Sequence, residues 1–110
     1  MKLLLLSSIF ALSIVAPLAV ASEPTPERQK ELVRMVRQDC GSCHGMTLNG
    51  GLGPALTADA LKARDIAKES LVATIIGGRQ GTPMPPWHRF LTEAEADWIV
   101  DRLLEGFPQQ

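Results

Sequence analysis

Apolar residues recur at helical spacing directly behind a helix-start signal near the beginning of the chain. Thr25, Pro26 and Glu27 give a hydroxyl residue, a proline and an acid in the order typical of a helix N-terminus. Leu32, Met35 and Val36 then fall on one helical face. The pattern predicts a helix from about Pro26 to Asp39 or into the cysteine motif behind it.

Two further helices are predicted towards the C-terminus. Residues 65–76 carry an apolar face and are followed by two glycines, which commonly end helices. The last helix begins at a capping box formed by Thr92 and Glu95 and stops at Gly106. Its apolar residues at helical spacing are Ala94, Trp98, Ile99 and Leu103.

Loops rich in glycine and proline separate these helices. Residues 45–56, GMTLNGGLGPAL, hold four glycines and a proline, and a short helix is expected after Thr57. Residues 79–90, RQGTPMPPWHRF, hold three prolines, which deny the loop regular hydrogen bonding. No stretch favours a strand, so we predict an all-α fold of three to five helices.

The first 21 residues have the pattern of a secretory signal peptide. A basic Met1-Lys2 start precedes an almost wholly apolar run, and residues 19–21, Ala-Val-Ala, form a small-residue cleavage site. The alternative is a retained membrane anchor, but the run is shorter than the ~20 apolar residues of a spanning helix and Pro17 interrupts it. We therefore expect cleavage after Ala21, one domain over residues 22–110, a periplasmic location and no stable membrane anchor.

Composition narrows the classes of function further. The 12 acidic and 11 basic residues leave a net charge of −1, without a basic stripe that could hold nucleic acid. Three Phe, two Trp and no Tyr make a thin core for so small a domain. A large apolar cofactor would complete such a core.

The motif DCGSCHG contains both cysteines of the chain and raises three possibilities. The spacing Cys40-x-x-Cys43-His44 is typical of c-type haem attachment, with two thioether links and an axial imidazole. A structural zinc site usually needs four ligands, and His88 is the only other histidine. A thioredoxin-like pair needs a βαβ context, and a Cys40–Cys43 disulfide closes a very small loop. The sequence favours one haem c.

A second axial ligand would decide what the iron does. Met84 is the candidate, because flanking prolines stiffen its loop and it lies far enough beyond His44 to reach the other haem face. Met35 is expected in the core, Met46 is too close to His44, and His88 is the rival ligand.

A His/Met pair raises the reduction potential and saturates the iron, which indicates an electron carrier and not an enzyme. The alternative is a haem enzyme or gas sensor with a labile sixth ligand.

With these motifs the chain resembles the class I c-type cytochromes over almost all of residues 26–106. The likeness is carried by CGSCH, GPAL at 53–56, TPMPPW at 82–87 and the last helix with Trp98. It implies a small helical fold wrapped around one covalently bound haem. The resemblance also implies that the Pro54 carbonyl orients His44, that Leu56 packs on the ring, and that Trp87 and Arg79 reach the haem propionates.

The sequence departs from many class I cytochromes where the first and last helices cross. Those cytochromes place a small residue and an aromatic at the positions held here by Leu32 and Val36. We expect the two helices to pack at a greater distance, with Trp98 filling the gap.

The likeness is closer to the short periplasmic cytochromes found alongside the cytochrome cd1 nitrite reductase of denitrifying bacteria. It implies transient redox partners, among them that reductase, or a part in maturing its d1 haem. The chain itself is expected to be a monomer.

Charge is sparse where a class I fold exposes the haem edge. Residues 41–58 hold no Asp, Glu, Lys or Arg, and residues 70–88 hold only Arg79. We expect a nearly neutral, partly apolar docking face with Arg79 as an isolated steering charge.

Overall fold

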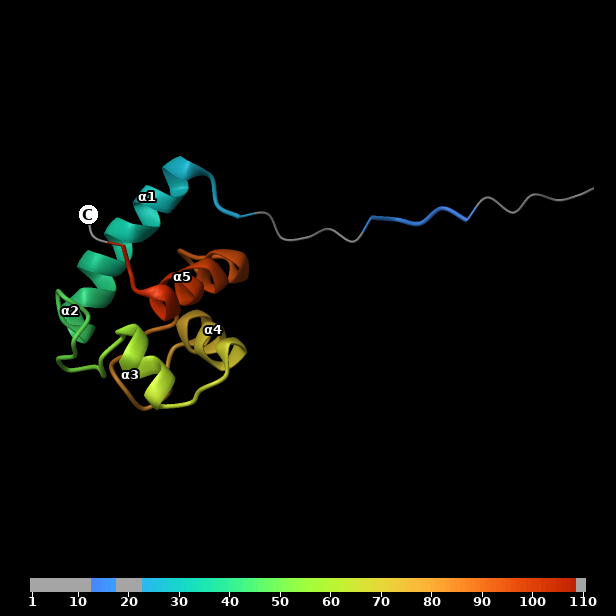
Figure 1. Cartoon of the computed structure of the whole chain (residues 1–110). Coiled ribbons are helices and arrows are strands. Elements are labelled where there is room, and N and C mark those ends of the chain that lie inside the picture. Colours follow the sequence, from blue (N-terminus) through green and yellow to red (C-terminus); the bar gives the residue numbers. More distant parts are fainter. Residues whose placement is uncertain (1–12, 18–22, 109–110) are drawn as a thin grey trace, which may run out of the picture.

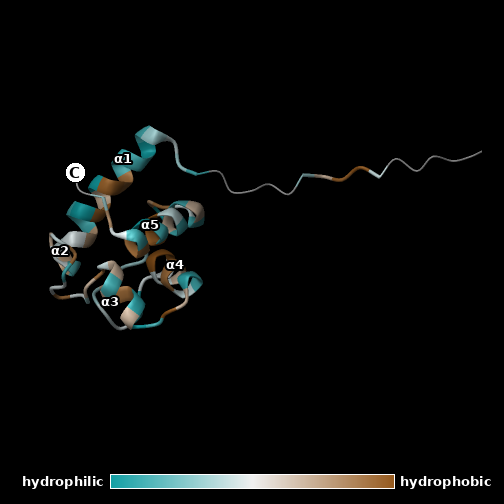
Figure 2. Ribbon diagram, viewed as in Figure 1, coloured by the Kyte–Doolittle hydropathy of each residue, from teal (hydrophilic) through white to brown (hydrophobic). Residues whose placement is uncertain are grey.

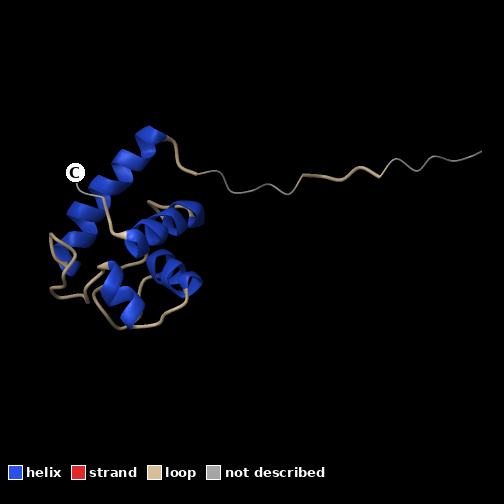
Figure 3. Ribbon diagram, in the orientation of Figure 1, coloured by secondary structure: helices blue, strands red, loops and turns tan. Residues whose placement is uncertain are grey.

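The computed structural model describes residues 13–17 and 23–108, and every regular element in them is a helix (Figure 3). This confirms the all-α prediction. The elements in order are α1 (Pro26–Met35), the π-helical turn η1 (Val36–Cys40), α2 (Gly41–His44), α3 (Ala58–Ala63), α4 (Lys68–Gly77) and α5 (Glu93–Glu105). None of the described helices is both long enough and apolar enough to cross a membrane.

Most of the predicted signal peptide, residues 1–12 and 18–21, lies outside the described residues. Residues 13–17 form no helix or strand and are exposed. The cleavage after Ala21 therefore stays a prediction.

The first helix runs without interruption into the cysteine motif. The Thr25 hydroxyl accepts a hydrogen bond from the Arg28 amide at 3.2 Å, and Pro26 occupies the first turn as predicted. Between α1 and α2 the backbone forms the wider turn η1, which ends at Cys40. Apolar spacing in the sequence does not reveal such a turn, and short π segments often mark functional positions.

The boundary of α4 differs from the prediction. The helix begins at Lys68 and not at Asp65, because Asp65 adopts a left-handed backbone with φ of 49°. The Asp65 amide donates to the Lys62 carbonyl at 3.1 Å and closes the end of α3. Helix α3 itself follows Thr57 as expected, with the Thr57 hydroxyl capping the Ala60 amide.

The capping box at the start of α5 is present in both directions. The Glu95 amide donates to the Thr92 hydroxyl at 3.1 Å, and the Thr92 amide donates to the Glu95 carboxylate at 3.0 Å. Ala96 and Val100, which the spacing analysis did not single out, are also fully buried on this helix.

Helix α5 lies between α1 on one side and α3 and α4 on the other (Figure 1). Apolar colour is concentrated on the helix faces that meet there (Figure 2). Leu32 and Val36 are 0% and 1% exposed and share one core with Trp98. The other buried members of this core are Leu48, Leu61, Leu91, Ile99 and Leu103. The backbones of α4 and α5 approach closely over more of their length than those of α1 and α5. The wider crossing expected from Leu32 and Val36 stays a prediction.

A partly buried ion pair joins α1 to α5. The Arg28 Nε donates to a Glu95 carboxylate oxygen at 2.7 Å, and the two side chains are 30% and 17% exposed. Arg28 also donates to Glu31 at 2.8 Å and to the Phe90 carbonyl at 3.1 Å. The hydrogen bond from Arg28 is the main cause that lowers the pKa of Glu95 below its ordinary value.

Replacing Glu95 with Gln should lower the free energy of unfolding by about 1 kcal/mol at pH 7, because the amide keeps the capping contact and loses the ion pair. A lowered folded-state pKa stabilises the protein above the unfolded pKa of ~4.3, and this contribution disappears as the pH falls through the folded pKa. Urea unfolding at pH 7 and pH 3 measures the difference.

The matched control is Glu93→Gln, which removes a carboxylate from the same first turn of α5. Glu93 forms no ion pair within the described residues, so this variant should show the smaller loss that any acid in that turn gives. Equal losses in both variants would show that the pair with Arg28 adds nothing.

Candidate haem site

The cysteine motif occupies the end of one continuous helical run. Cys40 is the last residue of η1, and Cys43 and His44 belong to α2. Both thiols are half-buried and free of a disulfide. Burial, with a smaller contribution from the charge of Asp39, raises the pKa of the Cys40 thiol to about 11. The Cys40 sulfur is therefore held as a thiol, and neither cysteine is engaged in a disulfide.

His44 is held by a carbonyl ten residues further along the chain. Its Nδ1 lies 2.7 Å from the Pro54 carbonyl oxygen. A carbonyl only accepts hydrogen bonds, so Nδ1 must carry the proton and donate it. In the neutral ring Nε2 then keeps its lone pair, which is the state needed to ligate a metal.

Gly53 makes room for this arrangement. A Cβ built on Gly53 would lie 2.7 Å from both Cε1 and Nδ1 of His44, well inside van der Waals contact. The Gly53 amide donates to the Cys43 carbonyl at 2.8 Å, so the loop is fastened beside the ring. Sequence reasoning gave Pro54 a role and missed Gly53, although the Gly-Pro pair was its available signal.

The remainder of the loop over residues 45–56 is closed by its own backbone. The Gly50 amide donates to the His44 carbonyl, and the Leu56 amide donates to the Leu48 carbonyl, both at 2.8 Å. Leu48 is 2% exposed and adopts φ of 61°, a left-handed conformation that a leucine rarely takes. Its burial in the core offsets that strain and anchors the loop, and Leu56 packs partly buried against the same core.

Met84 lies half-buried in the second loop, and the backbone around it is also fixed. The Arg79 amide donates to the Met84 carbonyl at 3.1 Å, and the Met84 amide donates to the Thr82 hydroxyl at 3.3 Å. Gly78, with φ of 66°, passes beneath this segment, where a Cβ would lie 2.8 Å from the Met84 carbonyl oxygen. The sequence showed Gly78 only as a helix end.

The remaining candidates occupy different environments. Trp87 packs partly buried against the core, its amide donates to the Ile75 carbonyl at 3.0 Å, and its ring centroid lies 5.7 Å from that of Phe90. The side chains of Arg79 and His88 are exposed. Of the other methionines considered as ligands, Met35 packs against the core as expected, and Met46 is 66% exposed.

These donors fit a haem c. Two free thiols three residues apart on one helical run suit two thioether links, and His44 follows directly with Nδ1 on the Pro54 carbonyl and Nε2 as the other ring nitrogen. Because Gly53 has no side chain, nothing at position 53 covers the His44 ring. Within the described residues no group of three or more His, Cys, Asp and Glu could hold a metal ion alone, so the zinc alternative finds no further ligands.

Residues 27–101 match a protein family described as "Cytochrome C oxidase, cbb3-type, subunit III". Relatives named cytochrome c55X cover most of the chain. The chain is 50% identical over 96 residues to the protein of Stutzerimonas stutzeri, an alignment that spans 87% of this chain and 83% of the relative. It is 52% identical over 98 residues to the protein of Pseudomonas aeruginosa, spanning 87% of this chain and 81% of the relative.

Solved structures give the same result. The c-type cytochrome NirC superposes with a TM-score of 0.71 and 56% identity, covering 74% of this chain and 94% of that protein. Dihydro-heme d1 dehydrogenase NirN, solved in complex with DHE, superposes with a TM-score of 0.60 and 31% identity, covering 70% of this chain but 16% of that protein.

The resemblance to the short cytochromes associated with cd1 nitrite reductase is thereby confirmed. The family match covers residues 27–101, and the relatives that cover most of the chain are about 50% identical to it. Both comparisons give the same assignment. The chain belongs to the c-type cytochromes and, within them, to the cytochrome c55X group, whose members are electron-transfer proteins and not enzymes.

Proposed function

We propose that this chain is a periplasmic electron carrier with one haem c, attached through Cys40 and Cys43 and ligated by His44 and Met84. The observation that carries the proposal is the hydrogen bond of 2.7 Å from His44 Nδ1 to the Pro54 carbonyl. It leaves Nε2 free and fixes the orientation of the ring, as such partners do for metal-ligating histidines.

When bound, a haem takes up and releases one electron as its iron alternates between the ferric and ferrous states. The role of the chain is to hold the ligand atoms still during that exchange. Both candidate ligands sit in segments that backbone hydrogen bonds close: Gly53 to Cys43 beside His44, and Arg79 to Met84 in the proline loop. Fixed ligands suit a carrier, because little geometry has to change with the oxidation state.

The covalent attachment needs no oxidant. Cys40 and Cys43 would hold the porphyrin through thioethers, each S–H adding across one vinyl group so that the sulfur bonds to one carbon and the hydrogen to its neighbour. The raised pKa of Cys40 keeps that sulfur as a thiol until it is activated. Export by the predicted signal sequence would place this step, and the mature protein, in the periplasm.

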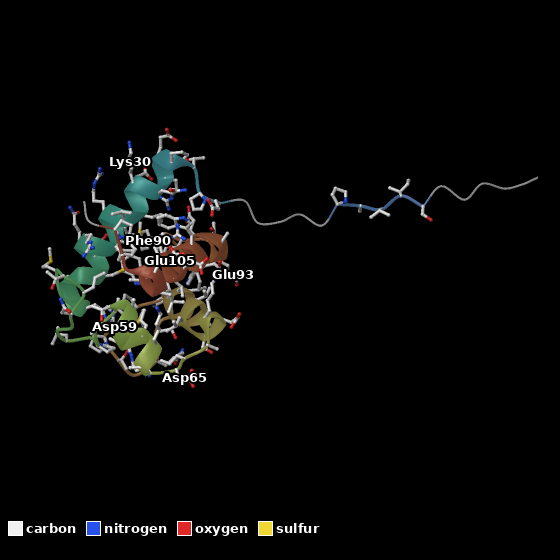
Figure 4. The ribbon with its side chains drawn as sticks, in the orientation of Figure 1. Lys30, Asp59, Asp65, Phe90, Glu93 and Glu105 are labelled. Carbon is white, nitrogen blue, oxygen red and sulfur yellow. The ribbon has the colours of Figure 1, made fainter. Side chains whose placement is uncertain are left out.

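We further propose a redox partner in denitrification, the cytochrome cd1 nitrite reductase. The likeness to NirC and to the cytochromes c55X supports it, one of these relatives being from Paracoccus denitrificans. The charge distribution suggests how the partner docks. Charged side chains such as Lys30, Asp59 and Glu93 lie on helices (Figure 4), while residues 41–58 contain none. In that segment Leu52 and Met46 are 90% and 66% exposed.

A second role is supported by a separate observation. The chain is 34% identical over 76 residues to part of a dihydro-heme d1 dehydrogenase of Pseudomonas aeruginosa, spanning 69% of this chain and 15% of that protein. A shared cytochrome domain favours participation in d1-haem maturation. Deleting the gene and measuring the d1-haem content of the reductase separates the roles: loss of d1 haem favours maturation, and slow nitrite reduction by a fully loaded reductase favours electron supply.

Replacing Met84 with Ala should abolish the weak red absorption band that methionine gives to ferric low-spin haem, and should lower the reduction potential. The measurement is the visible spectrum of the holoprotein in both oxidation states. Met46→Ala is the control, because Met46 is exposed and should leave the band unchanged. If the wild type lacks the band, His88→Ala becomes the informative variant, and ready carbon monoxide binding would instead favour the enzyme or sensor alternative.

Replacing Gly53 with Ala should destabilise the reduced holoprotein by about 1–3 kcal/mol, because the added Cβ would overlap the His44 ring that Pro54 holds in place. Urea unfolding measures the loss. Gly77→Ala is the control, since a Cβ there meets nothing within 4 Å, and it should be neutral or slightly stabilising. If both variants behave alike, His44 does not lie against Gly53 in the holoprotein.

The second-order rate of electron transfer to the nitrite reductase should change by no more than about twofold between low and moderate ionic strength, because the docking face is nearly neutral. Stopped-flow measurements over a salt series test this. Leu52→Glu should lower the rate at every salt concentration, since it places a charge on the exposed apolar tip. A steep fall with salt in the wild type would mean that charged groups dominate docking.

A further inference from the structure

Arg64 connects helix α3 to the loop that carries Pro54. It caps the C-terminus of α3, and its side chain is exposed. The guanidinium turns back along the helix: Nε donates to the Ala60 carbonyl at 3.3 Å, and Nη2 donates to the Ala55 carbonyl. One side chain therefore ties the helix to the residue that directly follows Pro54.

The bond to Ala60 has an ordinary explanation. The last carbonyls of a helix lack partners within it, and a cation near the C-terminus is favourable. The bond to Ala55 does not serve the helix, because Ala55 lies before its N-cap Thr57. Arginine suits both bonds at once, since its planar fork presents several donors in fixed directions.

The bond to Ala55 falls between two points at which backbone bonds hold the loop. These bonds join Gly53 to Cys43 and Leu56 to Leu48. Between them, the Pro54 carbonyl accepts from His44, and the bond from the Arg64 guanidinium is the only hydrogen bond to Ala55 among the described residues. Beyond His44 itself, Arg64 is the only side chain outside the loop that donates to its backbone in the described part of the chain.

We infer that Arg64 is a positioning residue for the proximal ligand. By holding the Ala55 carbonyl against α3, it fixes the backbone on the C-terminal side of Pro54 and keeps the Pro54 carbonyl on His44 Nδ1. The bond from Gly53 to Cys43 holds the backbone on the N-terminal side of Pro54, and the bond from Arg64 holds it on the C-terminal side. The inference rests on the proposed function, because it assigns Arg64 a role towards His44 as an iron ligand.

Hydrogen exchange in the reduced, diamagnetic holoprotein tests this directly. NMR would follow the Nδ1 proton of His44 in the wild type and in Arg64→Gln. Loss of the clamp should speed exchange of this proton about fivefold, the factor expected for roughly 1 kcal/mol of local opening. The amide proton of Val100, buried on α5, should exchange at an unchanged rate because the core is not touched.

Two matched variants separate the clamp from its charge. Lys62→Gln removes a cation from the same helix, and Lys62 makes no contact with the loop among the described hydrogen bonds, so His44 should exchange as in the wild type. Arg64→Lys keeps the charge and loses the fork, so exchange should stay faster than in the wild type. Full protection in Arg64→Lys would overturn the inference, because charge alone would then suffice.

Two other results would also overturn it: unchanged exchange at His44 in Arg64→Gln, or equal acceleration at Val100, which would mean general destabilisation. The reduction potential of each variant gives a second readout. Lys62→Gln alters the charge alone, whereas Arg64→Lys keeps the charge and alters the hydrogen-bond geometry. The visible spectrum of the wild-type holoprotein distinguishes failure of this inference from failure of the proposed function. A wild type without covalent haem refutes both, whereas a normal holoprotein with an indifferent Arg64 refutes only the positioning role.

Discussion

The hydrogen bond between His44 and the Pro54 carbonyl is the contact on which the rest of the site depends. It selects one tautomer of the imidazole and one orientation of the ring. The contact requires a glycine at position 53, because any Cβ there would enter the ring. It also requires the loop to return to the motif helix, which the bonds from Gly53 to Cys43 and from Gly50 to His44 accomplish. The imidazole is thus oriented by backbone geometry, which costs the chain no buried charge.

The helices supply the rigidity that this loop needs. Leu48 anchors the loop in a core whose largest share comes from α5, and it accepts an unfavourable backbone conformation to do so. Helix α5 is fixed in turn by its capping box and by the ion pair between Arg28 and Glu95. Helix α3 adds Arg64 on the outer side of the loop. Separate elements therefore converge on one imidazole, which is the arrangement expected where a cofactor must keep its ligand through many redox cycles.

The two loops differ in how they are closed. The glycine loop uses backbone hydrogen bonds and positive φ angles at Gly45 and Gly50, so it can turn tightly beside the motif helix. The proline loop has fewer backbone N–H donors. Hydrogen bonds among Arg79, Thr82 and Met84 hold it, and Gly78, which has no side chain, allows the backbone to pass close to Met84. The glycine loop carries no Asp, Glu, Lys or Arg, and the proline loop carries only Arg79 and Arg89, while the helices carry most of the ionic groups.

Local features of the sequence predicted most of the helices and indicated the chemistry expected of the cysteine motif. Periodicity and caps are local properties, so Pro26, Thr57 and the pair Thr92 and Glu95 predicted helix starts that the structure contains. The spacing of Cys40, Cys43 and His44 is also local, and it indicated haem c before any fold was known. The sequence did not predict the turn η1 or the late start of α4. One wide turn and the left-handed backbone of Asp65 do not change the spacing of the apolar residues. Only the tertiary structure decided what Gly53, Gly78 and Arg64 do, since each acts through a neighbour that chain folding, and not residue type, brings within contact distance.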